Sequence, residues 1–281
     1  MARETLASFD GRPLNVFSTG FAPQRPSVVL VLPFGVRHRI ADRLYAALAP
    51  HVNLVTWESR FVLDLEADAA EAAFDAELHV RDLVHVAEHV GRKAGRGDAA
   101  GPSVDVIGYC SGAGIGLMAA ARHPRIVRRL ALISGEFMLP ASLCKQSSFQ
   151  REVDMLLPAA ATSKTTARAL FEKISASRVE AQSEFHDFIS LPFSSADYLY
   201  RYGVNYVAYR RAGILEAAGD VAQPTLVMAA DDDRQVTLES ARIVRERLPN
   251  ATAVLTVEGD HYELCRANPR MTGELVRFFS A

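Results

Sequence analysis

A cysteine between two glycines, in Gly108-Tyr109-Cys110-Ser111-Gly112, is the part of the chain whose residue types and spacing point most directly to chemistry. An apolar run, Val104–Ile107, precedes it, and a stretch rich in alanine and glycine follows it. Strand, sharp turn and helix in this order form a nucleophile elbow, which exposes the central side chain. The glycines are expected where strand and helix approach too closely for a side chain. At a helix N-terminus the dipole favours the thiolate of Cys110, which is the nucleophilic form.

A thiol nucleophile needs a base, and the base needs a group that orients it. His261 directly follows the last apolar run of the chain, and the aspartates Asp231, Asp232 and Asp233 follow the run that ends at Ala230. If these runs are parallel strands, both loops emerge at the same sheet edge as the elbow, and the three sites can converge. The plainer alternatives are a buried core cysteine, a structural histidine and a solvated acidic turn.

The surrounding elements are expected to alternate between strand and helix. The opening reads as a hairpin around Asp10–Pro13, and Ser27–Pro33 and Asn53–Trp57 read as buried strands. Helices are predicted over Ile40–Leu48 and from Ala76 to Val90, the second ending in a glycine-rich surface loop. Continuous apolar strands that alternate with helices predict an α/β fold with a mostly parallel sheet covered on both faces.

The alternation stops after residue 137 and resumes at 223. Helical patterns fill 138–222, and no buried strand is expected there. We therefore predict a core made of residues 1–137 and 223–281, with a helical lid of residues 138–222 inserted between two strands, above the end of the sheet where the loops gather.

The whole chain resembles the α/β-hydrolase superfamily in its opening hairpin, its elbow, the lid position and the contexts of the acid and the histidine. The resemblance implies the chain order nucleophile, acid, histidine, and hence Cys110, Asp233 and His261 as the catalytic residues. Asp233 is preferred because the acid usually lies three residues after a small residue at the strand end. Asp231 and Glu136 are the alternatives for the acid.

The same resemblance implies an oxyanion hole made of backbone N–H groups. One comes from the residue after the nucleophile, Ser111, and the other from the loop after the strand that ends at Leu32. Relatives usually carry His-Gly in that loop, whereas this chain has Pro33-Phe34-Gly35. Gly35 is the first choice for the second donor, and Phe34 is the next.

Aromatic residues concentrate in the predicted lid. Five of the 8 tyrosines lie within 198–209, and such rings suit a channel for an elongated, partly polar acyl chain. The candidate substrate-binding residues are Tyr109, Tyr198, Tyr202 and Tyr206. Packing of the lid onto the core, or a dimer contact, is an equally good explanation of the lid tyrosines.

Gly-x-Cys-x-Gly is similar to the elbow of dienelactone hydrolases and polyhydroxyalkanoate synthases, and Dieckmann-type cyclases are similar in using Cys, His and Asp. We therefore expect acyl transfer or cyclising chain release through acyl-Cys110, formed from a carrier-protein or CoA thioester, in specialised, polyketide-like metabolism. A hydrolase (thioesterase, esterase or lactonase) of the same fold is the first alternative. A non-catalytic binding protein, in which Cys110 would be dispensable, is the second.

Composition limits the other possibilities. The chain has 281 residues and a formal net charge of -2, which gives no reason to expect nucleic acid or an anionic membrane as a partner. Its 3 cysteines are widely spaced, so neither a disulfide framework nor a metal cluster is indicated. We expect no cofactor, and the start of the chain lacks the apolar core of a signal peptide, which favours a cytoplasmic location. Oligomeric state cannot be inferred from these features.

Overall fold

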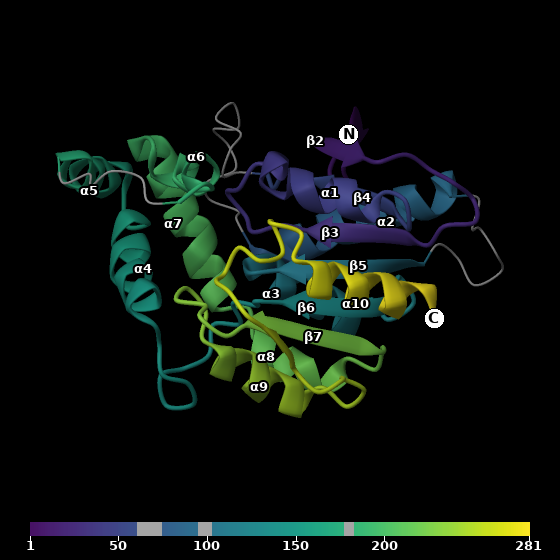
Figure 1. The fold of residues 1–281 in the computed structure, drawn as a ribbon. Coiled ribbons are helices and arrows are strands. Elements are labelled where there is room, and N and C mark those ends of the chain that lie inside the picture. The colour runs from purple at the N-terminus through teal and green to yellow at the C-terminus, as the bar shows by residue number, and fades with distance from the viewer. Residues whose placement is uncertain (61–74, 95–102, 177–182) are drawn as a thin grey trace.

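The computed structural model describes residues 1–60, 75–94, 103–176 and 183–281. Within these ranges, eight strands form one sheet in the order β1-β2-β4-β3-β5-β6-β7-β8 (Figure 1). The first two strands form an antiparallel hairpin, β2 is also antiparallel to β4, and β3 to β8 run parallel to one another. The strands are β1 (Ala2–Ala7), β2 (Pro13–Ser18), β3 (Ser27–Val31), β4 (Asn53–Trp57), β5 (Val104–Tyr109), β6 (Val127–Ile133), β7 (Thr225–Ala230) and β8 (Leu255–Val257).

Helices cover both faces of the sheet, as the continuous apolar strands predict. On one face, Val28 and Leu30 of β3 pack with the apolar residues of α1 (Asp42–Leu48) and α10 (Pro269–Ser280). On the other, Val29 and Val31 pack with α2 (Ala76–Lys93), α3 (Ser111–Arg122) and α9 (Leu238–Arg247). The mostly parallel α/β fold predicted from the sequence is confirmed.

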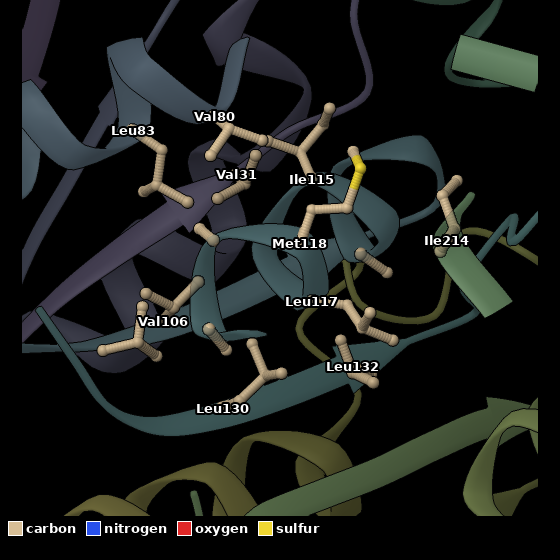
Figure 2. Close-up of a cluster of buried hydrophobic side chains, with 14 of the residues drawn as sticks. Val31, Val80, Leu83, Val106, Ile115, Leu117, Met118, Leu130, Leu132 and Ile214 are labelled. Carbon is tan, nitrogen blue, oxygen red and sulfur yellow. The ribbon is translucent and has the colours of Figure 1, made fainter. Parts of the chain in front are cut away.

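Helix α3, which begins beside the elbow, is buried from Ser111 to Ala120. Figure 2 shows its Ile115, Leu117 and Met118 among side chains from β3, β5, β6, α2 and α8. A helix that is apolar on all sides is held rigidly in the core. The start of α3, which positions the thiol, is therefore fixed by buried core packing.

Residues 138–222 contain helices and no strand in the part that the structure describes. Figure 1 shows α4 to α7 gathered beyond one end of the sheet. Helices α4, α5 and α7 form a small apolar cluster of their own, whereas Ile214 and Ala218 belong to the main core. The elements are α4 (Ser148–Ala160), α5 (Lys164–Ala176), α6 (His186–Ile189), a 3-10 turn (Leu191–Phe193), α7 (Ala196–Arg210), α8 (Ile214–Ala217) and a second 3-10 turn (Ala218–Asp220).

Some boundaries differ from the prediction. The last strand, expected from Ala251, is regular only from Leu255, and Ala251 makes an isolated bridge to Thr225. The helix expected from Ile40 begins as a 3-10 turn, His38–Ala41, and α1 follows it from Asp42. The predicted glycine-rich loop after α2 lies outside the described residues.

Candidate active site

Cys110 lies at a strained turn between β5 and α3. Its backbone has φ 52° and ψ −123°, a conformation that costs a non-glycine residue roughly 1–3 kcal/mol. A Cβ atom on Gly112 would lie 2.1 Å from the carbonyl oxygen of Val31, and one on Gly108 would lie 2.5 Å from Cα of Ala113. Both glycines are therefore required by close backbone approaches, as the sequence predicts.

Backbone hydrogen bonds hold the strained turn in place. The N–H of Cys110 donates to the carbonyl oxygen of Ile133 (3.1 Å), and its own carbonyl oxygen accepts from Ala113 (3.0 Å) and Glu136 (3.0 Å). Cys110 is thus tied to both β6 and α3. Its thiol is partly exposed, whereas Cys144 and Cys265 are buried, and all three cysteines are free.

His261, in the loop after β8, forms a buried pair with Asp233. Its Nδ1 lies 2.7 Å from Oδ2 of Asp233, and the two side chains are 4% and 1% exposed. The other carboxylate oxygen, Oδ1, accepts from the N–H groups of Gln235 (2.9 Å) and Val236 (2.8 Å). Asp233 is therefore fixed by its own loop, and its bond to Nδ1 leaves Nε2 of His261 for the thiol.

The two alternative acids lie elsewhere. Asp231 accepts from the N–H of Gly259 (3.1 Å). Glu136 accepts from the N–H of Met138 (2.9 Å) and from Gln150 (2.6 Å), and burial raises the pKa of its carboxyl. The geometry brings Asp233, and neither of these two groups, to Nδ1 of His261.

The electrostatic environment favours a charged ring at His261. Burial lowers the pKa of the ring, but the negative charges of Asp233 and Cys110, with hydrogen bonding to both, outweigh it. The pKa of His261 consequently rises from 6.5 to about 10. At neutral pH the arrangement therefore favours an imidazolium that faces the sulfur.

Tyr109 anchors the backbone of the histidine. It is fully buried, its hydroxyl donates to the carbonyl oxygen of His261 (2.9 Å), and its ring centroid lies 5.2 Å from that of His261. The residue before Cys110 thus fixes the position of His261.

The expected oxyanion donors differ in availability. The N–H of Gly35 donates to the hydroxyl oxygen of Ser59 (3.1 Å). Among the described residues, the N–H groups of Ser111 and Phe34 have no hydrogen-bond partner. Ser111 and Phe34 therefore keep free donors, whereas the amide of Gly35 is engaged.

A cavity of about 340 Å³ opens beside Cys110 and His261. Apolar side chains from the core and from the lid make up most of its lining, and Tyr109 and Tyr202 contribute to it. The other lining residues are Pro33, Val36, Ile40, Phe149, Ile174, His186, Ile189, Ser190, Pro192, Phe193, Gln235 and Tyr262. Such a lining suits an apolar acyl group.

The other two candidate tyrosines are not among the residues that line this cavity. Tyr206 lines a second, more polar cavity of about 330 Å³, where its hydroxyl donates to Asp154. Tyr198 is bonded through its backbone N–H to the capping side chain of Ser195. Of the three lid candidates, Tyr202 alone is thus placed in the lining of the Cys110 cavity.

Three residues near the site had no role in the sequence analysis. Ser59 holds the amide of Gly35, and Tyr262 accepts from the side chain of Gln235 (2.5 Å). Tyr209 of α7 places its hydroxyl 2.9 Å from the carbonyl oxygen of Ser111, which ties α7 to the elbow. The position of Ser59, two residues after a strand that neighbours β3, is a signal that could have identified it.

Known proteins are similar to the segment of the chain that contains the cysteine, the aspartate and the histidine of the site. Residues 100–264, which contain Cys110, Asp233 and His261, match the alpha/beta hydrolase fold family. The chain belongs to this family. L-allo-isoleucyltransferase of Pseudomonas savastanoi pv. glycinea is 24% identical over 275 residues, which cover 96% of this chain and 92% of that protein.

Solved α/β hydrolases share the fold over almost the full length. The enol-lactonase from Burkholderia xenovorans LB400 matches with a TM-score of 0.70 at 16% identity, covering 99% of this chain and 100% of that chain. An esterase from Exiguobacterium antarcticum matches with a TM-score of 0.71 at 16% identity, covering 99% of each chain. These likenesses concern the fold, and membership of the family supports an enzymatic role of the α/β-hydrolase type.

Two further observations concern metal-binding groups and helix length in this α/β hydrolase. Within the described residues, no group of three His, Cys, Asp or Glu side chains is arranged to hold a metal ion. No helix in those ranges combines the length and the apolar character that crossing a bilayer requires.

Proposed function

We propose that this α/β hydrolase transfers acyl groups from thioesters through an acyl-Cys110 intermediate. The observation that carries the proposal is a thiol at the strained elbow, facing the imidazole of His261 in an apolar cavity. Acyl exchange between two sulfur atoms is close to thermoneutral, so the acyl group stays activated while Cys110 holds it. A serine at this position would form an ester, which is a poorer acyl donor.

In the first half-reaction, the thiolate of Cys110 attacks the acyl carbonyl while His261 is already protonated. A bond forms between the sulfur of Cys110 and the acyl carbon, and the bond from that carbon to the donor sulfur breaks. The departing thiolate takes the proton from Nε2 of His261. Asp233 keeps the ring oriented and favours its charged form, in agreement with the raised pKa of His261.

In the second half-reaction, the neutral ring of His261 takes a proton from the acceptor. The acceptor then attacks the acyl carbon, and Cys110 leaves as a thiolate beside the re-formed imidazolium. An acceptor thiol gives transfer between carriers, and an internal carbanion gives cyclising release. The apolar side chains that the lid contributes to the cavity would reduce competition from water.

The donor class we propose is a CoA or carrier-protein thioester. L-allo-isoleucyltransferase acts, by its name, on an aminoacyl group, and its similarity extends over 96% of this chain. A branched aminoacyl group is therefore the first acyl group to test. The apolar lining that Val36, Ile40 and Ile189 contribute fits a branched hydrocarbon side chain.

A partition experiment tests transfer against hydrolysis. The acyl-enzyme is prepared with an acyl thioester, freed of excess donor and divided between buffer alone and buffer with a pantetheine thiol as acceptor. We expect the acyl group to appear on the acceptor thiol at a rate that rises with acceptor concentration. Free acid as the sole product at every acceptor concentration would contradict transfer and favour the thioesterase alternative.

A further inference from the structure

The loop after β3 presents its glycine amide away from the nucleophile. Gly35 donates to Ser59, which follows β4, whereas Cys110 follows β5. Strand β3 lies between those two strands in the sheet. A hydrogen bond from Val36 to Pro33 (3.3 Å), with Gly35 at φ +88°, closes a turn of the kind that needs glycine at this position. The oxyanion position beside Cys110 therefore lacks the amide of Gly35.

A tyrosine hydroxyl is available in the same cavity. Tyr202 lines the cavity together with Cys110, and among the described residues its hydroxyl has no hydrogen-bond partner. The hydroxyls of the other two tyrosines in the lining are engaged, that of Tyr109 with His261 and that of Tyr262 with Gln235. Tyr202 is partly buried, and a phenol hydroxyl without a protein partner in a cavity lining is free to donate a hydrogen bond to a bound ligand atom.

The ring of Tyr202 is held by aromatic neighbours. Its centroid lies 5.7 Å from that of Phe34, in the loop after β3, and 5.5 Å from that of Phe193, which it meets edge-on. Tyr209 lies seven residues further along α7, on the same face of the helix. Its hydroxyl, 2.9 Å from the carbonyl oxygen of Ser111, fixes α7 against the elbow. These contacts hold the ring of Tyr202 in the lining of the cavity to which Cys110 also belongs.

We propose that the hydroxyl of Tyr202 donates a hydrogen bond to the oxyanion formed at the acyl carbonyl, beside the N–H of Ser111. This inference rests on the acyl-Cys110 route proposed above. When the sulfur–carbon bond forms, the carbonyl electron pair moves onto the oxygen, which accepts from Tyr202 and Ser111. When the bond to the donor sulfur breaks, the pair returns to the carbonyl, and Tyr202 keeps its proton throughout.

The electrostatics of the cavity support this role. Burial raises the pKa of Tyr202 well above its ordinary range, and negative charge at Cys110 raises it further. The phenol therefore stays protonated beside a thiolate and remains a donor. Because Tyr202 belongs to helix α7, its hydrogen bond to the oxyanion would form only while that helix is docked on the core.

The test compares Tyr202→Phe with the wild-type enzyme and with Tyr200→Phe, a lid tyrosine outside the lining of this cavity. Two rates are measured on each protein: formation of acyl-Cys110 from an acyl thioester, followed by intact mass, and alkylation of Cys110 by iodoacetamide. Alkylation forms no oxyanion. Removal of one oxyanion donor costs on the order of 10²–10³-fold in related acyl-transfer sites. We expect a loss of that order in acylation by Tyr202→Phe, with alkylation unchanged and Tyr200→Phe normal in both.

The outcomes separate the two proposals. A wild-type enzyme that is alkylated at Cys110 but never acylated would overturn the proposed function itself. Normal acylation by Tyr202→Phe, or equal losses in acylation and alkylation, would leave the function standing and remove Tyr202 from the oxyanion site.

Fluorotyrosine at position 202 keeps the ring and makes the hydroxyl a stronger donor. We expect faster acylation with that substitution, and an unchanged rate would contradict the inference.

Discussion

The hydroxyl of Tyr209 lies 2.9 Å from the carbonyl oxygen of Ser111 and 2.6 Å from that of Glu136, although Tyr209 belongs to the helical segment 138–222. Ser111 begins the helix that follows Cys110, and Glu136 follows β6. A single buried phenol therefore joins α7 to two segments that hold Cys110 in position. The position of α7 and the geometry of the elbow are coupled through this contact.

Tyr209→Phe should lower the stability of the enzyme, because two buried carbonyl oxygens lose the same donor. The expected cost is about 1–3 kcal/mol in the free energy of unfolding, measured by denaturant titration.

Gly114→Ala tests the same contact from the other side, since a Cβ there would lie 2.0 Å from the hydroxyl oxygen of Tyr209. We expect Gly114→Ala to cost less in the Tyr209→Phe background than in the wild type. Additive effects of the two changes would mean that the hydroxyl does not occupy this position.

Gly112→Ala should prevent normal folding, because its Cβ would lie 2.1 Å from a backbone oxygen of β3. Main-chain atoms cannot move aside cheaply, and we expect a loss of roughly 3 kcal/mol or more in the free energy of unfolding. Gly273→Ala in α10 is the matched control, since no atom lies within 4 Å of its Cβ position. That change should raise stability by about 0.5–1 kcal/mol. Similar melting temperatures for Gly112→Ala and Gly273→Ala would contradict the close approach of the elbow to β3.

Asp233→Asn should lower the pKa of His261, because the negative charge of Asp233 is the largest influence that raises it. NMR titration of the ring measures this shift directly. Loss of the charge and of the oriented ring should slow acylation on the order of 10²–10⁴-fold. Asp231→Asn is the control, and we expect it to leave both the titration and the rate unchanged. A larger effect from Asp231→Asn would assign the role of the acid to that residue.

Stability should depend on pH through His261. Its pKa is about 10 in the folded enzyme, against about 6.5 in an unfolded chain. A group with a raised folded-state pKa contributes stability that is fully present below pH 6.5 and is lost as the pH rises through about 10. We therefore expect the melting temperature to fall between these values, and to fall less in His261→Gln. If the melting temperatures of the wild type and of His261→Gln depended on pH in the same way, a charged ring at His261 would be contradicted.

Much of the fold and of the candidate site follows from short stretches of sequence. The glycines at 108 and 112 indicate positions where a side chain would clash with nearby backbone atoms. The apolar runs indicate strands that are buried on both faces. Sequence reasoning also selects Asp233 and His261 for their positions just after strands, and the parallel sheet brings them together at one edge.

The remaining features depend on contacts between distant segments. The direction of the Gly35 amide is set by Ser59, which reaches it from a neighbouring strand. Which tyrosine of the lid lines the Cys110 cavity depends on the rotation of α7, and α7 is fixed by Tyr209. Similarly, His79 looks like a surface residue beside other helical histidines. It is buried against Asn205 of α7, and burial lowers its pKa to about 4.

The central claim, that the sulfur of Cys110 holds the acyl group, can be measured by intact-mass spectrometry. The enzyme is incubated with a panel of CoA and carrier-protein acyl thioesters, branched aminoacyl thioesters included, beside Cys110→Ala and, as a control, Cys144→Ala. We predict a mass increase equal to the acyl group in the wild type and in Cys144→Ala, lost in Cys110→Ala and mapped by peptide digestion to residue 110. A mass increase that persists in Cys110→Ala, or turnover of a thioester by that variant at the wild-type rate, would contradict the account.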